Sequence, residues 1–126
     1  SQAAEAAMAG TWALRVRTDG DDPKRAEDEG MPIVLAIDWD GAKLSGTATV
    51  WPAVRQPDGT VVEDPSKRVV FDLLEPRFDG QIFTFSVFNG EENLVGELKR
   101  VKDGAFEGRW ISMKSKLAGT LVMKRR

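Results

Sequence analysis

The chain has 126 residues, of which 41% are hydrophobic and 30% are charged, and its formal net charge is −2. This length and balance are typical of one globular domain, and the weak negative charge argues against a nucleic-acid-binding surface. Histidine, cysteine and tyrosine are absent, which excludes Ser-His and Cys-His nucleophiles, disulfide bonds and most zinc sites.

The first ten residues predict a short helical plug. Residues 1–9 are rich in alanine, the residue with the highest helix propensity, and Gly10 is a typical helix stop. This segment is too short for a signal peptide and lacks its apolar region, and no apolar run of the chain is long enough to cross a bilayer. The compartment is left open, and a secreted or periplasmic protein whose signal has been removed is compatible with the sequence.

After Gly10, apolar and polar residues alternate in a series of short segments, which indicates strands with one buried face. Strands are expected at residues 11–17, 32–38, 43–50, 68–74, 81–88, 94–101, 105–112 and 117–124. Asp-Gly or Asn-Gly dipeptides between several of them favour tight hairpins. We therefore predict an all-β fold, an eight-stranded antiparallel up-and-down β-barrel with a short N-terminal helix. Residues 1–10 would form the helix or plug, and residues 11–126 a single β-barrel domain.

The connections between the strands are unequal in length. In an up-and-down order, the long connections at 18–31 and 51–67 lie at one end of the barrel, and the short Asp-Gly turns lie at the other. Long loops in a compact domain are often functional, so we expect an open mouth between the long loops. The acidic side chains within 19–29 suggest calcium, but their spacing matches no EF-hand loop. We expect a solvated loop there and no metal site.

Gly10, Trp12 and Arg125 are expected to have structural roles at the tight-turn end of the barrel. Trp12 enters the core just after the helix stop, and the basic residues 124–126 come to the same end. Two interpretations of this basic tail are open. Either a cation of the tail lies over the indole of Trp12, or the tail is solvated.

Gly10-Thr11-Trp12 at the first strand, the meander of strands and the basic tail resemble the calycin group, which comprises lipocalins, fatty-acid-binding proteins and avidins. Gly10-Thr11-Trp12 followed by Leu44-Ser45-Gly46-Thr47 is similar to the start of avidins. The resemblance covers nearly the whole chain as topology and implies a barrel with an axial pocket. The tyrosines of the avidin biotin site and of the fatty-acid carboxylate clamp have no counterpart here. The resemblance therefore implies a pocket but names no ligand.

Four glycines, Gly46, Gly96, Gly108 and Gly119, share the inward-facing positions of their strands. One interpretation is that they open a cavity for a ligand, because an eight-stranded barrel can hold one small molecule. The other is that their role is structural: they let the strands of a small barrel coil tightly, or let a large aromatic ring cross the barrel axis.

The inward positions near the long-loop mouth are apolar. They are Val16, Ile33, Leu35, Val50, Phe71, Phe85, Val87, Leu94 and Trp110. No charged residue occupies an inward position there, so we expect these residues to bind a small hydrophobic or aromatic ligand. Without a polar anchor, the expected affinity is micromolar or weaker.

The predicted function is that of a non-catalytic, lipocalin-like barrel, without cofactor or metal, that binds a small apolar molecule in an axial pocket. A second hypothesis is a filled structural or interaction module, such as an accessory domain of a larger protein. A third is a cyclase or isomerase that acts by confinement, for which Ser112 is the only inward polar candidate near Trp110. Apolar residues on the outer face, such as Ile82 and Phe88, either form a homodimer surface or are scattered exposed side chains.

Overall fold

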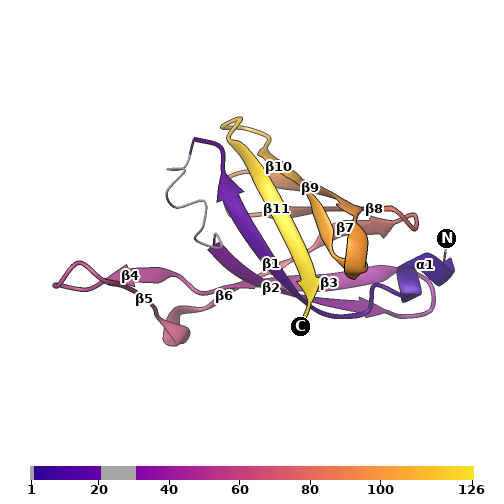
Figure 1. The fold of residues 1–126 in the computed structure, drawn as a ribbon, viewed down its shortest axis with the longest axis horizontal. Helices are drawn as coiled ribbons and strands as arrows, with labels where there is room; N and C mark the ends of the chain where they lie inside the picture. Colours follow the sequence, from indigo (N-terminus) through magenta and orange to yellow (C-terminus); the bar gives the residue numbers. More distant parts are fainter. Residues whose placement is uncertain (1, 21–30) are drawn as a thin grey trace.

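Nine antiparallel strands form one sheet that wraps into a nearly closed barrel, and a short helix precedes the first strand (Figure 1). The structure is a computed structural model that describes residues 2–20 and 31–126. In sheet order the strands are β6 (Val69–Asp72), β3 (Leu44–Val50), β2 (Met31–Trp39), β1 (Gly10–Thr18), β11 (Ala118–Arg125), β10 (Phe106–Ser112), β9 (Asn93–Arg100), β8 (Ile82–Phe88) and β7 (Leu74–Phe78). The helix α1 spans Gln2–Ala6. The predicted all-β antiparallel barrel with a short N-terminal helix is therefore confirmed, apart from the number of its strands.

The strand predicted over residues 68–74 corresponds to β6, which ends at Asp72, and a separate strand, β7, begins at Leu74, so the prediction of eight strands is wrong. β6 pairs with β3, and β7 pairs with β8 at the opposite edge of the sheet. Leu73 between them is buried and donates its N–H to the carbonyl of Gly46 at 2.9 Å. Glu75 then adopts a positive φ of 48°, and the β7–β8 pairing has a register shift at this point. This bend carries the chain from one edge of the sheet to the other and so nearly closes the barrel.

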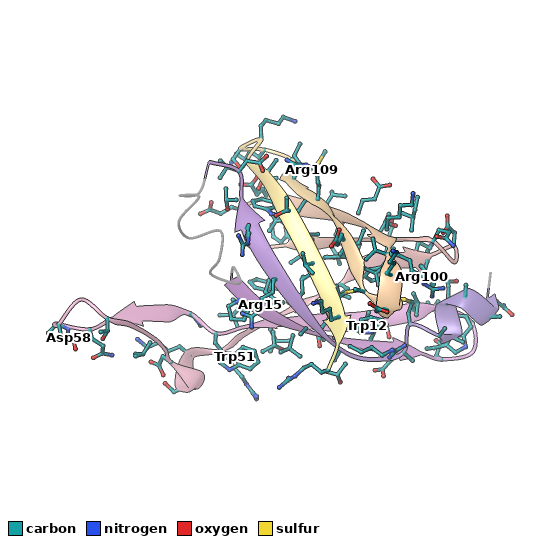
Figure 2. The ribbon with its side chains drawn as sticks, in the orientation of Figure 1. Trp12, Arg15, Trp51, Asp58, Arg100 and Arg109 are labelled. Carbon is teal, nitrogen blue, oxygen red and sulfur yellow. The ribbon has the colours of Figure 1, made fainter. Side chains whose placement is uncertain are left out.

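The connection predicted as a long loop at 51–67 is a structured arm. It contains β4 (Ala53–Arg55), β5 (Val61–Glu63) and a 3-10 turn, η2 (Pro65–Lys67). β4 and β5 pair as a hairpin that extends away from the barrel (Figure 1). Asp58 lies at the tip of this arm, where its carboxylate accepts a 2.9 Å hydrogen bond from the N–H of Thr60, and Trp51 lies at the base (Figure 2).

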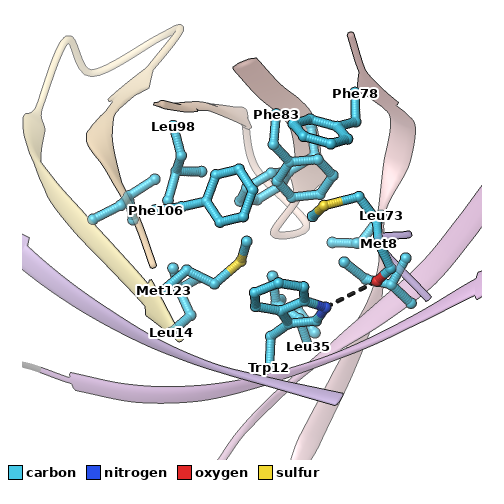
Figure 3. Close-up of a cluster of buried hydrophobic side chains, with 14 of the residues drawn as sticks. Met8, Trp12, Leu14, Leu35, Leu73, Phe78, Phe83, Leu98, Phe106 and Met123 are labelled. Carbon is cyan, nitrogen blue, oxygen red and sulfur yellow. Dashed lines mark hydrogen bonds between the residues drawn. The ribbon is translucent and has the colours of Figure 1, made fainter. Parts of the chain in front are cut away.

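A cluster of buried aromatic and methionine side chains fills the tight-turn end of the barrel (Figure 3). Trp12 and Phe106 contact edge to face with ring centroids 5.6 Å apart, and Phe106 contacts Phe78 in the same way at 5.6 Å. Met8, between α1 and β1, is only 1% exposed, and its carbonyl accepts a 2.9 Å hydrogen bond from the indole Nε1 of Trp12. Trp12 thus enters the core at this end, and Met8 plugs it.

The guanidinium of Arg125 lies over the ring of Trp12, with its Cζ atom 4.3 Å from the ring centroid. It also donates hydrogen bonds to the carbonyls of Ala9, at 3.0 Å, and Ala7. Gly10 lies beside the same guanidinium, where a Cβ would be 2.7 Å from Nη1 of Arg125. Of the two interpretations of the basic tail, the structure therefore shows the one in which a cation of the tail lies over the indole of Trp12. These contacts of Arg125 connect β11 to the helical plug.

Candidate functional site

An apolar cavity of about 290 Å³ lies inside the barrel at the end opposite Met8. Its lining residues are Leu14, Val16, Thr18, Ile33, Leu35, Ala48, Val50, Phe71, Phe85, Val87, Asn89, Leu94, Val95, Gly96, Trp110 and Leu121. Among them only Thr18, Asn89 and Trp110 carry polar side-chain atoms, and none is ionisable. The wall therefore offers apolar contact over most of its surface and polar groups in few places.

All nine residues predicted to bind a ligand line this cavity. Three of them, Leu35, Phe85 and Val87, are buried, and the others are half-buried. The half-buried residues are Val16, Ile33, Val50, Phe71, Leu94 and Trp110. Every second residue of a strand faces the same side of its sheet, which is why alternation predicts a common wall. Their role in binding a ligand stays a prediction.

Sequence reasoning missed part of the wall. Leu14, Ala48 and Leu121 also line the cavity. Their side chains face inward, but they lie deeper in the barrel than the residues that were predicted to bind a ligand. The sequence assigns Thr18 to a long loop and Asn89 to a turn, and both belong to the lining. The signal that points to Asn89 is its position directly after β8, at the mouth end of that strand.

The indole of Trp110 forms one side of the cavity and is held by the backbone. Its Nε1 donates a 2.9 Å hydrogen bond to the carbonyl of Arg17 on β1, across the intervening strand β11. Gly119 is the partner of Trp110 on β11, and a Cβ there would lie 2.6 Å from Nε1 and 1.7 Å from the carbonyl oxygen of Arg17. Gly119 therefore lets the ring cross β11, and the indole N–H is already engaged.

The other inward glycines also mark close approaches rather than open space. A Cβ on Gly46 would lie 2.6 Å from a backbone oxygen of β2, and one on Gly108 would lie 1.8 Å from a backbone oxygen of β9. Gly96 lines the cavity, but the ring of Phe85 covers it, 2.9 Å from the place of such a Cβ. The structure thus favours the structural interpretation of these glycines.

Hydrogen bonds between two turns brace the rim beside Asn89. The Oδ1 atom of Asn89 accepts 2.9 Å hydrogen bonds from the N–H groups of Glu91 and Glu92. Oε1 of Glu92 accepts bonds in turn from the N–H groups of Lys114 and Ser115, at 3.2 and 3.0 Å. These bonds, above all that from Ser115, hold the pKa of the Glu92 carboxyl below its ordinary value. The turns after β8 and β10 are thereby joined at the mouth.

The charged side chains of the described residues lie outside the cavity. Arg109 and Asp19 form an ion pair between side chains that are 59% and 55% exposed, so the pair adds little to stability. Most of the acidic segment that suggests calcium falls at residues 21–30, outside the described residues. Within the described ranges, no cluster of three or more acidic side chains is placed to hold a metal ion.

Ser112, the polar candidate of the confinement hypothesis, does not line the cavity. Ser112 is buried, with 3% of its surface exposed, but it is not among the residues that line the cavity. An enzyme that acts by general acid–base catalysis needs a proton donor or acceptor within hydrogen-bonding reach of its substrate. Within the part of the chain that the structure describes, the lining supplies no ionisable group for that task.

The nearly closed antiparallel barrel is compatible with a calycin-like fold. Among the helices of the described residues, none has the length and apolar character to cross a bilayer. No protein-family model matches the chain. A search of curated proteins finds no match to it either.

Proposed function

We propose that the protein is a non-catalytic, lipocalin-like barrel that binds a small hydrophobic or aromatic molecule in its axial cavity. The observation that carries the proposal is a wall of apolar side chains around a volume of about 290 Å³. This volume is close to the lower limit of small-molecule sites, about 300 Å³. The resemblance of Gly10-Thr11-Trp12 to the start of calycins supports the same function.

The burial of apolar surface sets the expected affinity. A ligand that buries about 300 Å² of apolar surface gains roughly 7.5 kcal/mol, at about 25 cal/mol per Å². The loss of translational and rotational freedom offsets several kcal/mol of this gain. We therefore expect dissociation constants that are micromolar or weaker.

A substitution that fills the cavity tests the proposal. Ala48 lines the cavity and is 4% exposed, so Ala48→Leu directs a larger side chain into the space that a ligand would use. We expect the wild type to bind the neutral two-ring dye 6-propionyl-2-(dimethylamino)naphthalene (prodan) with a rise in dye fluorescence. The variant should bind it at least about tenfold more weakly, because the apolar surface available to the dye falls. Fluorescence titration measures both constants.

Ala36→Leu is the matched control, because Ala36 is exposed on the neighbouring strand β2 and faces away from the cavity. This control should leave dye binding unchanged. A bound ligand at 100 times its Kd should also raise the free energy of unfolding by about 2.7 kcal/mol, and Tm with it. The absence of a Tm increase across a broad library of apolar molecules would contradict the proposal and favour the filled module.

A second candidate function is association through the outer face of the barrel. Several large apolar side chains on this face are exposed. They are Val70 at 52%, Phe88 at 50%, Leu74 at 41% and Ile111 at 40%. Large exposed apolar side chains are enriched where a surface is covered by a partner. We propose this face as the contact surface of a homodimer.

A further inference from the structure

The polar side chain at the rim of the cavity indicates which chemical class of ligand the cavity takes. Building on the proposed binding function, we infer that the cavity takes a neutral ligand of about two aromatic rings with a hydrogen-bond acceptor at its outer end. The side-chain NH₂ group of Asn89 donates to this acceptor. The orientation of the amide, the volume of the cavity and its lack of charge each support a part of this inference.

The amide of Asn89 is fixed in orientation and keeps a donor in reserve. Its Oδ1 atom accepts two backbone hydrogen bonds, from Glu91 and Glu92, both at 2.9 Å. Because these two N–H donors require an acceptor, the oxygen must face the turn and the NH₂ group must occupy the other position. Within the part of the chain that the structure describes, Nδ2 donates to no protein atom, and Asn89 lines the cavity.

Two other turns show that the backbone does not need an amide at this place. Asp40 and Asp79 each lie directly before a glycine with positive φ, as Asn89 does. Their carboxylates accept the same pair of backbone bonds, at 2.8 Å in every case. Both aspartate turns lie at the plugged end of the barrel, and the asparagine turn lies at the mouth. The NH₂ group of Asn89 is thus additional to what the turn requires.

The volume of the cavity sets the size of the ligand. An apolar cavity of about 150 Å³ binds a single benzene ring. The cavity of this barrel measures about 290 Å³, which leaves room for a second ring but not for a third. Phe71, Phe85 and Trp110 supply aromatic surfaces to its wall, and aromatic pairs gain more than their buried area alone provides.

Among the described residues, no charged side chain lines the cavity, which argues against an ionic ligand. A carboxylate or an ammonium group that entered the cavity would lose its hydration, and none of the described lining side chains would offer it an opposite charge. The indole N–H of Trp110 cannot assist, because it donates to the carbonyl of Arg17. A ketone, ester or ether oxygen loses less hydration and is matched by a single donor, which Asn89 supplies.

Matched naphthalene derivatives test this inference by competition with the two-ring dye prodan, whose own Kd is measured for each variant. 2-Acetylnaphthalene and 2-isopropenylnaphthalene have nearly the same shape, and only the ketone has an acceptor. We expect the wild type to bind the ketone about three- to tenfold more tightly than the alkene, the effect of one net hydrogen bond. The 2-naphthoate anion should bind at least about tenfold more weakly than the ketone. The one-ring acetophenone and the three-ring 2-acetylphenanthrene should both bind more weakly than 2-acetylnaphthalene.

Asn89→Asp removes the donor but keeps the oxygen that the turn needs, as Asp40 and Asp79 demonstrate. The variant should bind the ketone and the alkene equally. Its circular dichroism spectrum and Tm, compared with those of the wild type, verify that the barrel is intact. Asp79→Asn, the matched control at the plugged end, should retain the wild-type preference for the ketone.

The outcomes separate this inference from the proposed function. Equal binding of ketone and alkene by the wild type, or a preference for the ketone that persists in Asn89→Asp, would overturn the role of Asn89. If naphthoate bound most tightly, the inference that the ligand is neutral would be overturned. If the three-ring ketone bound most tightly, the inferred size of the ligand would be overturned. A wild type that binds none of these molecules would overturn the proposed function itself.

Discussion

Single glycines determine how closely the strands of this barrel approach one another. A Cβ on Gly119 would lie 1.7 Å from the carbonyl oxygen of Arg17, so the backbone would have to move. β11 is paired on one side with β1 and on the other with β10, and both pairings restrict such a movement. The residue that allows Trp110 to cross the sheet is therefore also one that keeps the barrel closed.

We expect Gly119→Ala to lower the free energy of unfolding by about 3 kcal/mol, the upper end of the usual cost of overpacking. Gly96→Ala is the comparison, because its nearest neighbour is the ring of Phe85, a side chain that can rotate away. Its loss should be about 1 kcal/mol. Urea denaturation followed by circular dichroism measures both values, and losses of equal size would contradict this explanation.

The wall of the cavity could be predicted from the sequence because a strand alternates its side chains regardless of its neighbours. Val16 and Val87, for instance, face the same space although they lie far apart in the sequence. Asn89 could not be assigned to that wall in the same way. Its place before Gly90 already explains it as a turn residue, and only the fold shows that this turn borders the cavity.

At the scale of elements, the turns after β8 and β10 form one unit through Glu92. The hydrogen bonds from Ser115 and Lys114 lower the pKa of its carboxyl, so the folded state favours the ionised form. A carboxyl with a lowered pKa stabilises the fold above its unfolded pKa, about 4.3. This contribution is lost as the pH falls through the pKa of the folded state.

Glu92→Gln should therefore lower Tm at pH 7, and the difference from the wild type should shrink when the pH is brought to 3. Thermal unfolding at both pH values measures this change. The control is Glu91→Gln, because Glu91 lies in the same turn and accepts none of the bonds from Lys114 or Ser115. A Tm difference that is the same at both pH values would contradict the role of the charge.

The sequence predicted most of the elements but not the break between β6 and β7. Residues 69–74 are apolar apart from Asp72, which takes an outward position, so the sequence pattern gives no sign of an interruption. Pro76 is the available signal, because proline inside a strand marks an edge or a bulge. The arm was missed for another reason: Asp58-Gly59 is a hairpin dipeptide, but its flanking strands are only three residues each.

At the scale of the whole molecule, the exposed apolar residues of the outer face lead us to expect self-association. Phe88→Lys should weaken it, because a charged side chain would lie in the contact surface. Sedimentation velocity over a range of protein concentrations measures the change. Thr120→Lys, an exposed position on the outer face of β11, is the control and should leave association unchanged. A wild type that stays monomeric at every concentration would contradict the homodimer.

The bond from Arg125 to the carbonyl of Ala9 joins residues that are 116 positions apart, and the pairing of β1 with β11 spans similar distances in the sequence. Contacts of such long range slow folding, because the loop between them must be closed before they form. During synthesis β1 has only β2 beside it until residues 118–125 leave the ribosome. Its free edge is therefore open to wrong pairing for most of translation, and ring closure is expected to be a late step of folding.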